Sequence, residues 1–171
     1  MNITTLDQAG IAARIPHSGS MCLLHTLDAW CADSIRCSAI GHADANHPLR
    51  TAGGLLAPVA IEYAAQAMAL HGGLNAPPGS PPTPGFLAAV RNVKLHVRRL
   101  DDVPGTLAVS AQRLAGDERQ ALYRFALHSA AGALLVEGRA TVILNALPAP
   151  APGSFHLLPP AAASGRIGVF G

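Results

Sequence analysis

The sequence predicts an α+β fold in which a curved antiparallel β-sheet wraps around one long central helix. Residues 57–72 are apolar on nearly every side, which is typical of a helix enclosed by protein. Residues 85–144 alternate between apolar and polar side chains, as strands do when one face packs on a core. Two shorter strand-like stretches precede the helix, and this order of elements favours an α+β domain.

The segment before those two strands, residues 4–14, is expected to form a short helix. Thr4 or Thr5 can cap its start, and Pro16 requires it to end near Arg14. The stretches "MCLLHTLDAW" and "SIRCSAIGH" then resemble strands separated by the turn "CADS". Residues 43–54, rich in Asp, Asn, Pro and Gly, form a loop that leads into the central helix.

The central helix is expected over Ala57 to Gly72. Pro58 is tolerated in a first turn, and the pair Gly72-Gly73 provides a stop signal. The proline-rich loop "NAPPGSPPTPG" follows. Four strands are then expected, carried by "FLAAVRNVKLHVRR", "GTLAVSAQRL", "ALYRFALHS" and "ALLVEGRATVIL".

The length and composition indicate one compact domain over residues 1–145 with a C-terminal tail over 146–171. Half of the 171 residues are hydrophobic and 13% are charged, which suits a globular protein with a sizeable core. The tail is rich in Pro and Ala and has no acidic residue, so we expect an extended arm or a disordered segment. The tail is not expected to form a second domain.

The charge and cysteine patterns exclude several classes of protein. Twelve basic and ten acidic residues leave a net charge of +2 without a basic run, so nucleic acid is not an expected partner. Cys22, Cys31 and Cys37 lack metal-type spacing and are expected to be free thiols in the cytoplasm, a reducing compartment. No export signal is expected at the N-terminus, and no membrane span is expected over residues 55–72.

Glu62 is the candidate for chemistry, because it stands in an otherwise apolar helix. A glutamate in such a place must be protonated, hydrogen-bonded or facing a cavity. Gln66 lies one turn further along the same face and could orient the carboxyl group. The alternative is an ion pair at a subunit interface, with a partner among Arg50, Arg91 and Arg98. The composition of the helix leaves both interpretations open.

Two histidines in the loop before the helix, His42 and His47, are candidate bases, although a loop histidine is most often only solvated. The other histidines show no spacing that would bind zinc, so no metal is expected: His17, His25, His71, His96, His128 and His156. No Gly-x-Ser-x-Gly, phosphate loop or Gly-x-Gly-x-x-Gly occurs, and no cofactor is expected.

Four stretches in order resemble 3-hydroxyacyl-[acyl-carrier-protein] dehydratases of the FabZ/FabA type. "IPHSGSMCLLHTLDAW" resembles their Leu-Pro-His opening, and "IEYAAQAMA" resembles their central helix, with Glu62 and Gln66 in matching positions. "GFLAAVRNVKLHVRRLDDVPGTLAV" and "YRFALHSAAGALLVEGRATVIL" resemble the strands that follow. The resemblance covers about residues 13–144 and is greatest to the dehydratase-like branch found with aryl-polyene biosynthesis.

The resemblance implies a hotdog fold, with the sheet as the bun and the helix as the filling. In this family two subunits pair their sheets edge to edge, and each site combines a histidine of one chain with a carboxylate of the other. By this comparison Glu62 is the acid and His47 the base, with His42 as a rival. Backbone N–H groups of Ala57 and Val59 would polarise the thioester oxygen. Phe86 would line an apolar tunnel for the acyl chain.

The expected function is dehydration of a 3-hydroxyacyl thioester, carried by acyl carrier protein or coenzyme A, to the trans-2-enoyl thioester. One alternative is a hotdog thioesterase in which Glu62 activates water. Another is a non-catalytic subunit that pairs with an active one, and it predicts that both loop histidines point away from Glu62. The assembly would be a homodimer, a higher oligomer or a mixed complex. A basic surface could dock an acidic carrier, or be an ordinary solvated strand face: Arg91, Lys94, Arg98 and Arg99.

Overall fold

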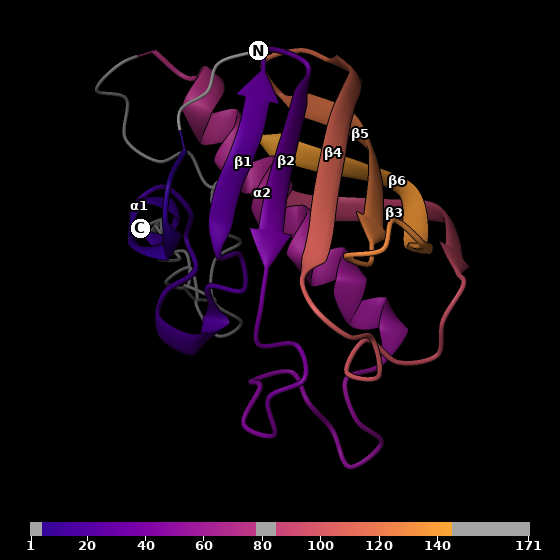
Figure 1. Cartoon of the computed structure of the whole chain (residues 1–171). Coiled ribbons are helices and arrows are strands. Elements are labelled where there is room, and N and C mark those ends of the chain that lie inside the picture. The colour runs from indigo at the N-terminus through magenta and orange to yellow at the C-terminus, as the bar shows by residue number, and fades with distance from the viewer. Residues whose placement is uncertain (1–4, 78–84, 145–171) are drawn as a thin grey trace, which may run out of the picture.

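The computed structural model describes residues 5–77 and 85–144, which form a curved six-stranded sheet around a central helix (Figure 1). The strands lie in the order β1-β2-β4-β5-β6-β3, and every neighbouring pair is antiparallel. This arrangement confirms the predicted α+β hotdog architecture. The strand bounds are β1 Thr26–Cys31, β2 Ser34–Ala39, β3 Gly85–Leu95, β4 Leu107–Gly116, β5 Gln120–His128 and β6 Leu134–Leu144.

The central helix α2, Ala60–Asn75, follows a 3-10 turn η2, Ala57–Val59, that contains Pro58. The predicted end at Gly72-Gly73 was wrong, because α2 continues through both glycines. Glycine weakens a helix interior by only about 1 kcal/mol, which the packing of the rest of α2 offsets. The helix ends where Ala76 adopts an extended backbone, a conformation favoured for a residue that precedes proline.

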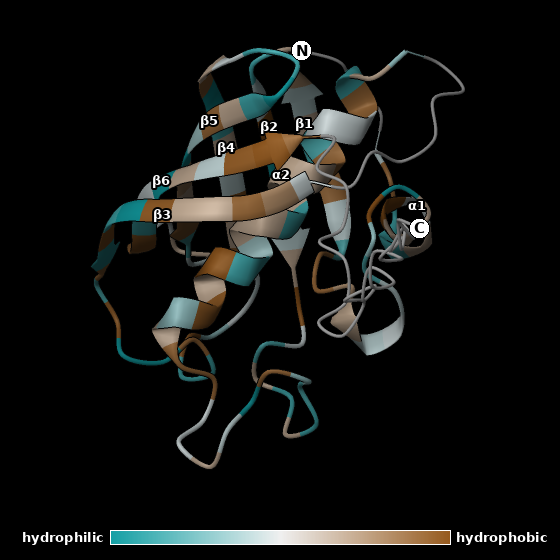
Figure 2. Ribbon diagram, turned by 180° about the vertical axis from the view of Figure 1, so that it is seen from behind, coloured by the Kyte–Doolittle hydropathy of each residue, from teal (hydrophilic) through white to brown (hydrophobic). Residues whose placement is uncertain are grey.

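The inner face of the sheet packs on α2, as the view from behind shows (Figure 2). Along β5 the inward side chains are buried and alternate with more exposed ones, as the sequence pattern predicts. Alanines at several buried positions of α2 keep its surface narrow, so the strands can approach it closely. The helix is therefore enclosed on most sides, which explains its lack of a polar face.

The short N-terminal helix α1, Gln8–Ala12, also forms, with a different cap from the predicted one. Asp7 caps it by accepting a hydrogen bond from the Gly10 N–H at 2.8 Å. Among residues 5–77 and 85–144, no helix has the length and apolar character needed to cross a membrane. The predicted tail over 146–171 lies outside the described residues.

A buried histidine fastens the far end of α2 to the sheet. The Tyr123 hydroxyl donates to His71 Nδ1 at 2.9 Å, and His71 Nε2–H donates to the Cys31 carbonyl at 2.9 Å. Both ring nitrogens are engaged in the neutral form, and burial lowers the pKa of His71 below its ordinary 6.5. Protonation of His71 would place a hydrogen on Nδ1, so Tyr123 could no longer donate to that atom and would have to accept from it.

We predict that the free energy of unfolding falls as the pH is lowered from about 7.5 to 5.5. Since the pKa of His71 is lower in the folded chain, the unfolded chain binds more protons below pH 6.5. For one extra proton bound by the unfolded chain, the free energy of unfolding falls by at most about 1.4 kcal/mol per pH unit. Urea unfolding at both pH values measures the difference. His71→Gln, which keeps a donor for the Cys31 carbonyl but does not titrate, should flatten this dependence, and an unchanged slope would contradict the assignment.

Candidate active site

Glu62 lies in the first turn of α2, and its side chain is 32% exposed. Its Oε1 accepts a hydrogen bond from Gln66 Nε2 at 3.0 Å and lies 3.1 Å from His17 Nε2, within ion-pair distance. Its Oε2 has no hydrogen-bond partner among the described residues. The carboxyl group is therefore held through one oxygen, and the other is left for a substrate.

Gln66 is fully buried and uses its whole amide group. Its Oε1 accepts from the Leu23 N–H at 2.9 Å, while its Nε2 donates to the Met21 carbonyl at 2.8 Å and to Glu62. The contact between Gln66 and Glu62 predicted from their spacing is thus present. Gln66 also binds the segment before β1 to the central helix, which the sequence did not indicate.

His17 belongs to this site, although sequence reasoning set it aside because it lacked metal-type spacing. The ring comes from the turn after α1 and is 27% exposed. The available signal was the position of His17 inside the Leu-Pro-His-like opening of the resemblance. Nothing in its local sequence points to a contact with a helix so much later in the chain.

His47, the predicted base, is turned towards Tyr63 and away from Glu62. The Leu49 N–H donates to His47 Nδ1 at 3.2 Å, which places the ring proton on Nε2, from where it donates to the Tyr63 hydroxyl at 3.0 Å. Burial lowers the pKa of His47, so its ring is neutral at pH 7. In this arrangement the neutral ring has no free lone pair with which to take a proton.

His42, the rival base, is only 2% exposed. Its Nε2–H donates to the Val103 carbonyl at 2.8 Å, and its Nδ1 has no partner among the described residues. Neither His42 nor His47 forms a hydrogen bond or ion pair with Glu62 in the described part of the chain. A single chain therefore brings Glu62 and Gln66 together and keeps both loop histidines apart from them.

The backbone donors expected at the start of the helix are already in use. The Ala57 N–H donates to the Arg98 carbonyl, and the Val59 N–H donates to the Leu56 carbonyl, each at 3.0 Å. Neither group is free to polarise a thioester oxygen in this structure. Phe86 lies opposite Ile143 at one end of the edge strand β3 and is 45% exposed, so it lines no tunnel within one chain.

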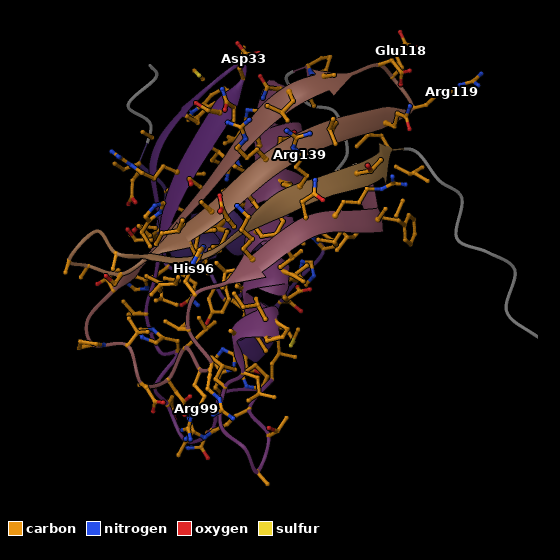
Figure 3. The ribbon with its side chains drawn as sticks, turned by 90° about the vertical axis from the view of Figure 1, so that its right-hand side faces the viewer. Asp33, His96, Arg99, Glu118, Arg119 and Arg139 are labelled. Atoms are coloured by element: carbon orange, nitrogen blue, oxygen red, sulfur yellow. The ribbon has the colours of Figure 1, made fainter. Side chains whose placement is uncertain are left out.

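The predicted basic cluster is divided between two regions. Lys94 lies on β3 and pairs with Glu137 at 3.3 Å, whereas Arg98 and Arg99 follow the end of that strand at Leu95. Figure 3 shows Arg99 in the loops beyond the sheet, far from Arg139 on the sheet surface. The expectation that these four basic residues share one strand was wrong, because β3 ends at Leu95.

The alternative ion pair of Glu62 with an arginine across a subunit interface stays a prediction, and within the described part of one chain no such pair forms. Arg50 Nη2 binds Asp101 at 2.8 Å, and Glu62 forms no ion pair with Arg50, Arg91 or Arg98. The hydrogen bonds from Arg99 are the main cause that holds the pKa of the Asp101 carboxyl well below its usual range. These charges join the loop before the helix to the loop after β3, and none of them contacts Glu62.

Two hollows in the described surface lie away from Glu62. One of about 340 Å³ lies on the sheet between Arg36 and Arg124, and another is lined by Arg113 and residues 117–119 of the β4–β5 turn. Within the described ranges, no three His, Cys, Asp or Glu side chains gather as metal ligands would.

A curved antiparallel sheet around a helix that carries a hydrogen-bonded glutamate defines a hotdog-fold protein. The chain belongs to the ApeP-like family, whose sequence model, described as ApeP dehydratase, matches residues 9–149. That match covers the whole sheet and the central helix. No curated protein matches the chain.

Solved structures share this fold. The dehydratase heterocomplex ApeI:P from Xenorhabdus doucetiae contains a chain with a TM-score of 0.68 and 22% identity, covering 78% of this chain and 90% of that one. Thioesterase HI1161 from Haemophilus influenzae has a TM-score of 0.59 and 15% identity, with coverage of 83% and 92%. Thioesterase PA1618 from Pseudomonas aeruginosa, a mutant, has a TM-score of 0.54 and 16% identity, with coverage of 71% and 80%. At these identities the likeness shows the fold alone.

We predict that Gln66→Leu lowers the free energy of unfolding by about 2–4 kcal/mol. The substitution leaves the Leu23 N–H and the Met21 carbonyl without their partner, and each buried unsatisfied group costs about 1–3 kcal/mol. Urea denaturation measures the change. Glu62→Gln is the matched control, since it keeps both backbone contacts of Gln66 and should change stability by less than about 1 kcal/mol. Equal losses in the two variants would contradict the role of Gln66.

Proposed function

We propose that this chain provides the acid of a hotdog dehydratase that converts a 3-hydroxyacyl thioester to the trans-2-enoyl thioester. The observation that supports this most is the state of Glu62, with one oxygen bound by Gln66 and close to His17 and the other without a partner among the described residues. The glutamate lies on the central helix of a chain from the ApeP-like dehydratase family. The thioester would be carried by acyl carrier protein or coenzyme A.

The reaction needs one base and one acid. The base removes a proton from Cα, the electron pair forms the double bond, and the bond from Cβ to the hydroxyl oxygen breaks. Glu62 gives its proton to the departing hydroxyl, which leaves as water. Each such transfer typically contributes about 10²–10⁴-fold to the rate.

The base is proposed to come from a second hotdog subunit. In this chain His47 has no free lone pair, and His42 is enclosed beside Val103. A homodimer would present the same two histidines, so a mixed pair fits better. The structure of ApeI:P, which is described as a heterocomplex, adds support for a pair of different subunits.

The edge strand β3 is the proposed contact with that subunit. It is 11 residues long and pairs with β6 alone among the described strands, so its other edge is open. Large apolar side chains on it are 40–48% exposed: Phe86, Leu87 and Leu95. An open, apolar edge favours addition of another strand. The acyl tunnel would then form between the subunits, in the cytoplasm, where the three cysteines stay reduced.

We predict that this chain, co-purified with a hotdog partner subunit, forms enoyl product from 3-hydroxyacyl pantetheine thioesters. Glu62→Gln should lower the rate by about 10²–10⁴-fold, because an amide cannot deliver the proton. Absorbance of the enoyl thioester and a thiol reagent, read together, measure dehydration and hydrolysis.

The same assay separates the alternatives. Thiol release without enoyl product would establish a thioesterase and refute the proposal. If the chain alone forms enoyl product and His47→Ala abolishes this activity, then His47 of this chain is the base and the mixed pair is refuted. If neither product forms with the partner present, the chain is a non-catalytic subunit and the proposal is refuted.

We also predict that Leu95→Glu weakens association with a second subunit by at least about tenfold. A charge placed at the open edge of β3 must be desolvated when a strand adds there. Native mass spectrometry or sedimentation measures the assembly. Leu114→Glu is the control, because Leu114 is similarly exposed, at 38%, but lies on β4 away from the edge. Equal effects would show that β3 is not the contact.

A further inference from the structure

We infer that His17 is a positioning residue that, together with Gln66, directs the transferable proton of Glu62 to Oε2. This inference rests on the proposed function, in which Glu62 is the acid. It adds a residue and a specific oxygen atom to that role, and both follow from the polar contacts around the carboxyl group.

The argument begins with the two donors on Oε1. Gln66 Nε2 and His17 Nε2 both lie within 3.1 Å of this oxygen, and an N–H group can donate only to a lone pair. An acidic hydrogen on Oε1 would compete with both nitrogens for that oxygen, which favours Oε2 as its position. That atom has no partner among the described residues, so it can face the hydroxyl group of a substrate.

The chain brings His17 to this place through Gln66. The amide of Gln66 holds Met21 and Leu23, at the end of the segment that begins with His17. Gly19 turns that segment with a φ of 58°, a conformation that glycine adopts without strain. His17 therefore reaches Glu62 from a segment already bound to α2.

The ring of His17 is suited to donate and not to accept. Donation to Glu62 requires the hydrogen on Nε2, and Nδ1 is buried without a hydrogen-bond partner among the described residues. This is the tautomer that supplies one fixed N–H to the carboxyl group. No described acceptor would favour the other tautomer.

The contact adds little to folding stability. The two side chains are 27% and 32% exposed, and a partly exposed pair of this kind is screened by solvent. Its effect should therefore appear in the reaction, where a misdirected acid can lower a rate by about 100-fold.

The test compares His17→Leu with His17→Gln in the active assembly. Leucine removes the donor, and kcat should fall by about 10- to 100-fold with KM changed less than about twofold. Glutamine can place an N–H near the same point and should keep kcat within about fivefold of the wild type. A histidine at the end of β5, His128, serves as the control, and His128→Gln should leave kcat unchanged.

A double-mutant cycle shows whether His17 acts through Glu62. In a Glu62→Gln background, His17→Leu should have no further effect on kcat, because the proton it directs is gone. The inference is overturned if His17→Leu is as active as the wild type, if it changes only KM, or if its effect persists fully without Glu62. Loss of activity in His17→Gln equal to that in His17→Leu would indicate direct proton transfer by His17 and would also overturn it.

A spectroscopic measurement keeps this inference separate from the proposed function. Nitrogen-15 NMR of the histidine rings should show the Nε2–H tautomer of His17 in the wild type and lose that preference in Glu62→Ala. If the assembly dehydrates no thioester but this signature is present, the proposed function fails and the hydrogen-bonded arrangement stands. If the tautomer does not respond to Glu62→Ala, the positioning role fails regardless of activity.

Discussion

The site depends on one buried amide. Gln66 satisfies a backbone N–H and a backbone carbonyl of the segment before β1 and still has a second N–H for Glu62. Since an unpaired buried polar group is costly, the helix and this segment can come together only in the register that satisfies all three contacts. The position of the carboxyl group is therefore a consequence of the same bonds that close the fold.

Two tyrosines have a related role at opposite ends of α2. Tyr63 binds His47 in the loop before the helix, and Tyr123 binds His71 near the helix end. Burial keeps both imidazoles neutral, as the lowered pKa of each indicates, and a neutral ring can satisfy one donor and one acceptor. These histidines hold the helix in place, which is why a histidine in the expected loop does not become a base within this chain.

The edge strand β3 and the Oε2 atom of Glu62 both have groups without a partner among the described residues. The sheet covers α2 on its inner face, yet one edge retains exposed apolar side chains and an unpaired backbone. In the proposed assembly, a second subunit at that edge would bury those side chains. The burial of the β3 edge and the supply of the proposed base would then both depend on the same second subunit.

The sequence by itself determined the elements and one contact of the site. A period of two residues predicted the strands, and a run apolar on nearly every side predicted the helix. The spacing of Glu62 and Gln66 placed them on one face, because such patterns are local. The sequence did not locate His17 beside Glu62, turn His47 towards Tyr63, or carry α2 past Gly72. Those outcomes belong to the tertiary structure, because they depend on which distant groups satisfy each other when the sheet closes around the helix.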